Sequence, residues 1–128
     1  MNLLLDTHVF IWWASEPTKL SSKVLELFED TDNILVLSVA SVWEMQIKMQ
    51  LGKLDLNMPI EDLIESQQQA NDIRILPVNL HHVYSLSTLP PHHNDPFDRL
   101  LIAQSNSEGF TLVSKDQKLK TYASNIIW

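Results

Sequence analysis

The 128-residue sequence contains no cysteine, which excludes disulfide bonds and zinc sites built on thiolates. Long apolar runs are also missing. The longest, Val9 to Ala14, is six residues, whereas a helix that crosses a bilayer needs about 20. The first residues, Met1 to Leu5, have neither the basic start nor the long apolar stretch of a signal peptide. These absences together predict a cytoplasmic protein without a membrane partner.

Basic residues are scarce: nine Lys and Arg stand against sixteen Asp and Glu, for a net charge of −7. Affinity for nucleic acid normally comes from Lys and Arg, so this balance counts against a simple nucleic-acid binder. It does so only weakly, because a bound divalent cation would reverse the field around an acidic site. Basic residues also gather beside two acids that are important below, Asp98 and Asp116; they are Arg99, Lys115, Lys118 and Lys120.

What is present is ordinary for a folded protein, with 45% apolar and 20% charged residues. The length suits one domain, residues 1–128, without internal repeats or linkers. Short apolar runs predict strands at Leu3–Leu5, Ile34–Leu37, Arg74–Leu76, Phe110–Val113 and Asn125–Ile127. Helical spacing and caps predict helices near Val9–Ala14, Ser22–Phe28, Ser38–Leu51, Ile60–Ala70, Asn79–Leu86, Phe97–Ser107 and Gln117–Ala123, with a loop at Pro90–Asn94. This alternation predicts an α/β fold with a mainly parallel sheet covered on both faces.

Four carboxylates stand where a lone charge is expensive to bury: Asp6, Glu44, Asp98 and Asp116. Asp6 and Asp116 each follow a predicted strand, and in such folds ligands bind beyond the carboxyl ends of the strands. Glu44 and Asp98 lie on helix stripes that otherwise carry apolar residues. With so few Lys and Arg available as partners, a divalent cation is the expected one. Oxygen ligands without cysteine favour Mg²⁺ or Mn²⁺ over zinc.

Each of these acids also has a purely structural interpretation. Asp6 and Asp116 are good N-caps for the helices that follow them. Glu44 is placed for an i,i+4 ion pair with Lys48, worth about 0.3–0.5 kcal/mol. Asp98 could close a capping box. A metal site requires the four acids to converge on one edge of one sheet, whereas separate helix caps do not.

Asp95 and Asp98 look alike but are expected to differ. Asp95 precedes Pro96, which is the pattern of an N-cap followed by proline at the first helical position. Asp98 shares its stripe with residues that face inward. We therefore expect Asp95 to shape the start of the helix, with a supporting contact to the site, and Asp98 to reach the metal.

Histidine and tryptophan give weaker signals. His81–His82 and His92–His93 are adjacent pairs, and neighbours along a helix or strand do not face one another, which argues against a zinc site. His8 follows Asp6 closely enough to touch a substrate. The tryptophans are more often core or interface residues than platforms for bases. Trp12 and Trp13 cannot both face inward, so one is expected to mark a partner surface.

Four segments carry a resemblance to a known family: LLLDTHVFIWW, SVASVWEMQIKMQLGKL, HHNDPFDRLLIAQS and GFTLVSKDQKL. They resemble the PIN-domain ribonucleases, and within them the VapC-type toxins of bacterial toxin–antitoxin pairs. The resemblance covers essentially the whole chain, and DPFDRLLIAQ is its most specific part. It implies a three-layer fold with a parallel sheet of about five strands between helices.

The resemblance further implies a pocket formed by the same four acids, with Thr7 and Ser114 as supporting polar groups. It implies endonucleolytic cleavage of RNA with Mg²⁺ or Mn²⁺, a homodimer, and a small antitoxin whose tail enters the groove. We expect Asp6 and Asp98 to hold the principal metal and Asp116 to complete the site. Glu44 would bind a second metal or orient the attacking water. Cleavage should leave 5′-phosphate and 3′-hydroxyl ends.

Two other classes compete. A phosphorylatable receiver domain is also acidic, α/β and about this long, but it needs paired acids after the first strand and an Asp after the third. Here Asp6 is single, and the third predicted strand leads into Pro77. A non-catalytic scaffold that only engages a partner protein would keep the fold without the chemistry.

Overall fold

A computed structural model describes residues 1–91, 94–123 and 125–128. Five strands form one sheet, and six α-helices and three 3₁₀ helices accompany them in the described residues. The strands are β1 (Asn2–Leu5), β2 (Ile34–Ser38), β3 (Arg74–Leu76), β4 (Thr111–Val113) and β5 (Ile126–Ile127). The α-helices are α1 (Thr7–Ser15), α2 (Ser22–Glu29), α3 (Val39–Gln50), α4 (Ile60–Asn71), α5 (Leu80–Ser85) and α6 (Pro96–Glu108). The 3₁₀ helices are η1 (Pro17–Lys19), η2 (Leu86–Thr88) and η3 (Gln117–Thr121).

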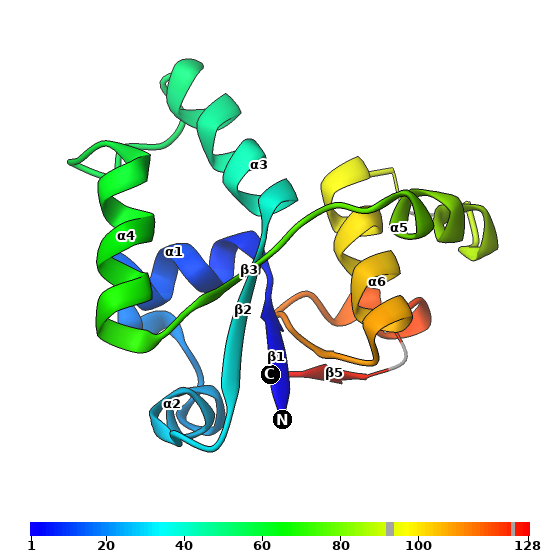
Figure 1. Cartoon of the computed structure of the whole chain (residues 1–128), viewed down its shortest axis with the longest axis horizontal. Coiled ribbons are helices and arrows are strands. Elements are labelled where there is room, and N and C mark those ends of the chain that lie inside the picture. The colour runs from blue at the N-terminus through cyan, green and yellow to red at the C-terminus, as the bar shows by residue number, and fades with distance from the viewer. Residues whose placement is uncertain (92–93, 124) are drawn as a thin grey trace.

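The sheet has the strand order β3-β2-β1-β4-β5, and all four pairings are parallel. The central strand β1 pairs on one side with β2, where Leu3 lies opposite Leu35. On its other side it pairs with β4, where Leu5 lies opposite Val113. The carboxyl ends of the strands therefore share one edge, and the segments that leave β1, β2 and β4 begin beside one another there (Figure 1).

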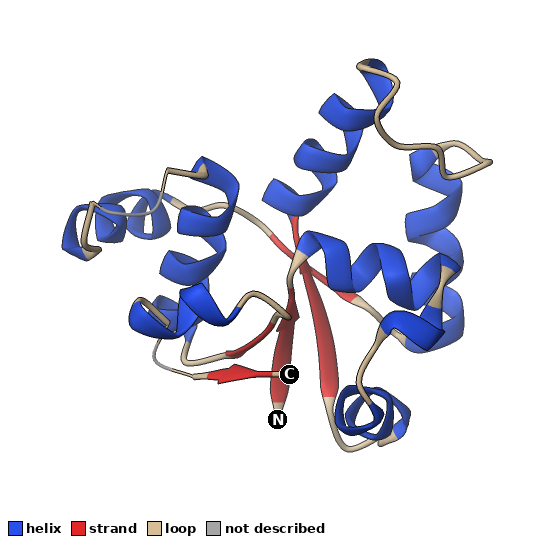
Figure 2. Cartoon of the chain, turned by 180° about the vertical axis from the view of Figure 1, so that it is seen from behind, coloured by secondary structure: helices blue, strands red, loops and turns tan. Residues whose placement is uncertain are grey.

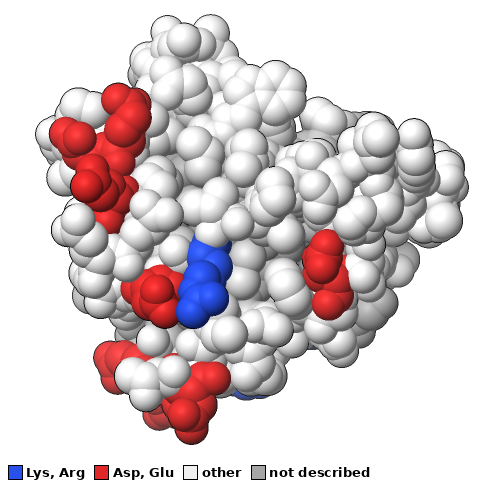
Figure 3. Space-filling model, viewed as in Figure 1, with Lys and Arg blue, Asp and Glu red and all other residues white. Residues whose placement is uncertain are grey.

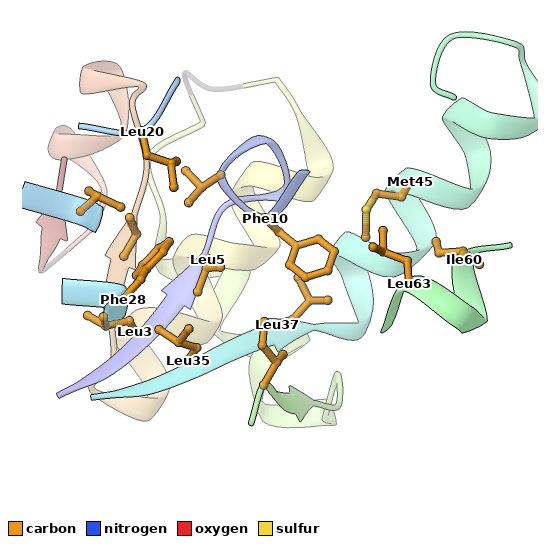
Figure 4. Packing of buried hydrophobic residues seen from close by; sticks show 14 residues of the cluster. Leu3, Leu5, Phe10, Leu20, Phe28, Leu35, Leu37, Met45, Ile60 and Leu63 are labelled. Carbon is orange, nitrogen blue, oxygen red and sulfur yellow. The ribbon is translucent and has the colours of Figure 1, made fainter. Parts of the chain in front are cut away.

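Alternation along the strands divides the core into two clusters, one on each face of the sheet. Leu3 and Leu5 of β1 belong to the larger cluster, whereas Leu4 between them belongs to the smaller one. Helices α1 to α4 supply the larger cluster, part of which is seen in Figure 4. Helix α6 supplies Leu101 and Ile102 to the smaller one. Figures 1 and 2 show the resulting three layers, with α1, α2 and α4 on one side and α5 and α6 on the other.

Local sequence signals explain where most helices begin and end. Ser21 caps α2 through the Val24 N–H, and Ser38 caps α3 through the Ala40 N–H. Asp95 caps α6 and Pro96 is its first residue, as predicted. Gly109 ends α6 in the left-handed conformation, with φ of 70°.

The structure differs from the predicted elements in small ways. The sheet is entirely parallel rather than mainly so. The helix predicted at Gln117–Ala123 is a 3₁₀ helix that ends at Thr121. The predicted loop at Pro90–Asn94 is described except at 92–93, so the His92–His93 pair lies outside the described residues. In the described part of the chain, no helix is long and apolar enough to cross a membrane.

The expectation that His81 and His82 do not meet is wrong. Their ring centroids lie 4.1 Å apart, and both Nε2 atoms face Glu108 at the end of α6, at 3.3 and 2.7 Å. His82 is fully buried, and its Nδ1 accepts the backbone N–H of Asn79 at 3.0 Å. The proton of the neutral His82 ring therefore sits on Nε2 and is donated to Glu108. This pair ties the start of α5 to the end of α6.

Replacing Gly109 with alanine tests the end of α6. No atom lies within 4 Å of the position that a Cβ would take, so the cost is purely conformational. We expect Gly109→Ala to lower the free energy of unfolding by about 1–2 kcal/mol, measured by urea denaturation. Gly109→Asn, which tolerates the left-handed region better, should cost less. Equal losses for both variants would contradict this explanation.

The Glu108 contacts predict a pH dependence of stability. Hydrogen bonding to His82, partly opposed by desolvation and aided by His81, lowers the pKa of Glu108 below its ordinary value of 4.5. A carboxyl whose pKa is lower in the folded than in the unfolded protein contributes its full stabilisation above the pKa of the unfolded state. That contribution is lost as the pH falls through the pKa of the folded state. In urea unfolding, wild type should therefore lose its advantage over Glu108→Gln below about pH 4.5. The exposed Glu65→Gln on α4 is the control, and a pH-independent advantage would refute the assignment.

Candidate active site

A cleft of about 390 Å³ lies at the carboxyl edge of the sheet, where the chain leaves β1 and β4. All four predicted acids line it, and each comes from a different segment: Asp6 after β1, Glu44 from α3, Asp98 from α6 and Asp116 after β4. The full lining is Asp6, His8, Val9, Trp12, Glu44, Lys48, Asp95, Asp98, Lys115 and Asp116. The cleft therefore lies beyond the carboxyl ends of the strands, where the sequence predicted a ligand site.

Asp6 is buried, with 7% of its surface exposed, and is held by short-range donors. Its Oδ1 accepts the backbone N–H of His8 at 3.0 Å, so it is also the N-cap of α1. Its Oδ2 accepts the hydroxyl of Ser114 at 2.7 Å. Burial alone would raise the pKa of Asp6, but the hydrogen bonds from His8 and Ser114 outweigh it, so the pKa lies below its ordinary 3.8. Asp6 is therefore ionised at neutral pH.

His8 stands over the same carboxylate. Its Nδ1 lies 3.7 Å from Asp6 Oδ1, and more than half of its side chain is exposed. The attraction of Asp6 raises the pKa of His8 above its ordinary 6.5, against a smaller opposing effect of desolvation. His8 thus places a titratable ring at the cleft, as expected from its position in the sequence.

Glu44 is equally buried and is engaged at both of its oxygens. Its Oε1 accepts the hydroxyl of Thr7 at 2.7 Å, and the same hydroxyl lies 2.9 Å from Ser41 Oγ. Its Oε2 lies 2.9 Å from Lys48 Nζ. The i,i+4 pair with Lys48 and the position in the cleft thus occur together rather than as alternatives.

Ser114 joins the two acids that follow strands. While its hydroxyl donates to Asp6, the same oxygen accepts the backbone N–H of Asp116 at 3.1 Å. Asp116 in turn accepts the N–H of Lys118 at 3.0 Å and caps η3. One buried serine therefore fixes the spacing between the loops that leave β1 and β4.

The two acids at the start of α6 have different positions, one as its N-cap and one in its first turn. Asp95 accepts the N–H groups of Phe97 and Asp98, at 2.9 and 3.2 Å, and also lines the cleft. Asp98 lies in the first turn, with Leu101 and Ile102 of its stripe buried. Arg99 donates to the backbone oxygens of Pro90 at 2.7 Å and Leu86 at 3.3 Å. It therefore holds the segment before α6 and is not part of the cleft lining in the described residues.

Sequence reasoning did not predict Trp12, Lys48 or Lys115 as lining residues of the cleft. A signal existed for two of them. Lys48 lies one helical turn after Glu44, and Trp12 lies one turn after His8, so each pair shares a helix face. The direction of Lys115, between Ser114 and Asp116, depends on the loop geometry and could not be read from spacing.

The cleft acids do not form a closed cage. In the described part of the chain, only His81, His82 and Glu108 bring three ligand atoms within 4.8 Å of one another. A cation bound at Nε2 of His82 would need the ring proton moved to Nδ1, which would break the bond with the Asn79 N–H. The histidine cluster is therefore a structural contact. The cleft offers carboxylate oxygens, the donors that Mg²⁺ and Mn²⁺ prefer, in a more open arrangement.

Comparison with known proteins places this fold and cleft in context. The PIN domain family matches residues 3–125. The chain is 30% identical over 122 residues to ribonuclease VapC22 of Mycobacterium tuberculosis, covering 94% of this chain and 92% of that protein.

Solved structures share the fold at low sequence identity. VapBC2 of Rickettsia felis, bound to a promoter DNA fragment, superposes with a TM-score of 0.75 at 16% identity, covering 100% of this chain and 98% of that one. DNA-bound VapBC of Salmonella typhimurium gives a TM-score of 0.70 at 13% identity, covering 99% and 97%. With a family match over nearly its whole length, the chain belongs to the PIN-domain family.

Proposed function

We propose that this protein is a Mg²⁺- or Mn²⁺-dependent endoribonuclease, the toxin of a toxin–antitoxin pair. The observation that carries the proposal is that Asp6, Glu44, Asp98 and Asp116 line a single cleft although they come from four separate segments. Two helix caps, one i,i+4 ion pair and one first-turn acid with no common task would not need to converge. The similarity to a ribonuclease over most of the chain supports the same conclusion.

The donor chemistry of the cleft fits a hard divalent cation, with Asp6 and Asp98 as its principal ligands and Asp116 completing the site. A bound Mg²⁺ or Mn²⁺ would supply an acidified water and would neutralise charge on the phosphate oxygens. Glu44 would hold a second ion or orient the attacking water. Asp95 supports Asp98 by fixing the first turn of α6.

The remaining polar groups of the site prepare these acids. Ser114 holds Asp6 ionised and sets its spacing from Asp116. Thr7 and Lys48 fix the carboxylate of Glu44 at both oxygens, so it faces the cleft in one orientation. Such preorganisation lowers the reorganisation needed when charge develops on the phosphate. Hydrolysis by water does not use the ribose 2′-hydroxyl, so the products carry 5′-phosphate and 3′-hydroxyl ends.

The same proposal includes partners. Structures of the same fold are VapBC assemblies, which supports an antitoxin protein as a partner here. We further propose that the protein forms a homodimer and acts in the cytoplasm. Co-purification with the product of a short neighbouring reading frame, followed by mass measurement of the complex, tests the first two points.

The receiver-domain alternative does not fit the observed topology. Flavodoxin-like sheets, to which receivers belong, have the order 2-1-3-4-5, whereas this sheet has β3-β2-β1-β4-β5. The non-catalytic scaffold is separated from the enzyme by the following variants.

Asp98→Asn and Asp6→Asn remove one ligand charge each while keeping the shape of the side chain. We expect each to lower RNA cleavage by on the order of 10²–10³-fold, because the cation would lose a principal ligand. Cleavage of total RNA with Mg²⁺, with Mn²⁺ and with EDTA, followed by mapping of the cut ends, provides the measurement. Asp62→Asn, an exposed acid in the first turn of α4, is the matched control and should cleave normally.

Three results would refute the mechanism: cleavage that survives both cleft substitutions, cleavage that persists in EDTA, or ends that carry a 2′,3′-cyclic phosphate. A wild-type protein that binds its partner protein but leaves RNA intact under all metal conditions would favour the scaffold.

A further inference from the structure

We propose that a cleft beside the acidic site binds the RNA strand that enters it, and we call it the lysine cleft. It measures about 490 Å³ and is lined by Lys23, Lys115, Gln117, Lys120, Ile126, Ile127 and Trp128. This inference rests on the proposed function, because it names the surface that holds the substrate of that site. It answers how a chain of net charge −7 could hold a polyanion.

The lysine cleft brings together three lysines that have no carboxylate partner among the described residues. Among the described residues, no carboxylate lies within 4.0 Å of Lys23, Lys115 or Lys120, and no acidic side chain lines the cleft. Lys48 and Arg74, by contrast, are paired with Glu44 and Asp72. The face shown in Figure 3 carries several acidic patches and one small basic patch, so positive charge is not spread evenly. A phosphate chain would be attracted locally even though the whole protein is acidic.

The lysine cleft lies next to the acidic site. Lys115 lines both of them. Its Nζ lies 5.8 Å from the ring centroid of Trp12, which lines the acidic site, and the Trp12 and Trp128 centroids are 6.0 Å apart. A strand could therefore pass from the acids, over Lys115, to the lysines beyond.

The aromatic rings favour nucleic acid over other polyanions. Trp12 and Trp128 are partly buried against the larger core cluster and keep some exposed surface, and Trp128 lines the lysine cleft. Interleaved cations and aromatic faces bind a single strand by holding phosphates and stacking bases. An acidic peptide would use the lysines alone. The geometry therefore points to single-stranded RNA, held by Lys23, Lys115 and Lys120, with bases against Trp12 or Trp128.

The test compares two double variants that remove the same charge. Lys23→Gln/Lys120→Gln removes two lysines of the cleft. Lys118→Gln/Arg74→Gln is the control: Lys118 shares the η3 helix with Lys120 but does not line the cleft, and Arg74 lies on β3 at the opposite edge of the sheet. Thermal unfolding of both verifies that they fold. Binding of a short fluorescein-labelled single-stranded RNA is followed by anisotropy, with Ca²⁺ to limit cleavage.

We expect the cleft variant to bind RNA about tenfold more weakly than wild type at about 0.1 M salt. The slope of log affinity against log salt should become shallower by about 1.4, since each lost phosphate contact contributes about 0.7 for a single strand. In Mg²⁺ the variant should raise KM more than it lowers kcat. The control should match wild type. Inorganic polyphosphate of equal phosphate number should bind more weakly than RNA, because it has no bases to stack.

If the two double variants weaken RNA binding equally, or if neither weakens it, the assignment of the lysine cleft is wrong. RNA cleavage by wild type would still support the proposed function in that case. Equal binding of polyphosphate would reduce the lysine cleft to an anion site, and preferential binding of an oligoglutamate peptide would make it a protein-docking site; either result overturns the RNA assignment. If wild type neither binds nor cleaves RNA, the proposed function fails and this inference falls with it.

Discussion

The hydrogen bond from Ser114 to Asp6, 2.7 Å long and spanning 108 residues of sequence, is the contact on which the site depends. It exists because β1 and β4 are paired in parallel, which brings the loop after each strand to the same edge. Without it Asp6 would be a buried carboxylate short of a donor, and such groups are costly to leave unsatisfied. The same oxygen holds the backbone of Asp116, so one hydroxyl sets the spacing of two acids.

Helix capping and a position in the cleft occur together in three of the acids. Asp6, Asp95 and Asp116 each cap a helix, and each also lines the cleft. A capping carboxylate is fixed by backbone N–H groups, so its orientation costs little further entropy. A carboxylate oxygen held in a fixed position is suited to a cation. Local structure thus prepares the donors, and the sheet brings them together.

Charge in this molecule is organised regionally. Five of the sixteen acids line the cleft, while Lys23, Lys115 and Lys120 gather beside it without carboxylate partners among the described residues. Proposed substrate binding then depends on this local arrangement rather than on the total charge. Because exposed charges are screened over about 8–10 Å in physiological salt, neighbouring regions of opposite sign can act separately.

The fold was predictable from local signals because they are strong and consistent here. The strand runs of Leu3–Leu5 and Ile34–Leu37, the cap at Ser38 and the proline after Asp95 each specify a local conformation with little tertiary help. The strand order and the meeting of His81, His82 and Glu108 were not predictable in this way. His81 and His82 meet, against the expectation for neighbours on a helix. They lie on the short helix α5, and both contact Glu108, which comes from α6.

The sequence alone determined the alternation of strands and helices and identified the four acids as candidates. Each of these follows from residues within a few positions along the chain. Only the tertiary structure decided that Glu44 is held by Thr7 and Lys48 together, that Arg99 turns toward backbone oxygens, and that Lys115 joins two clefts. These depend on the directions of side chains and on which segments the sheet places beside one another, and sequence spacing specifies neither of them fully.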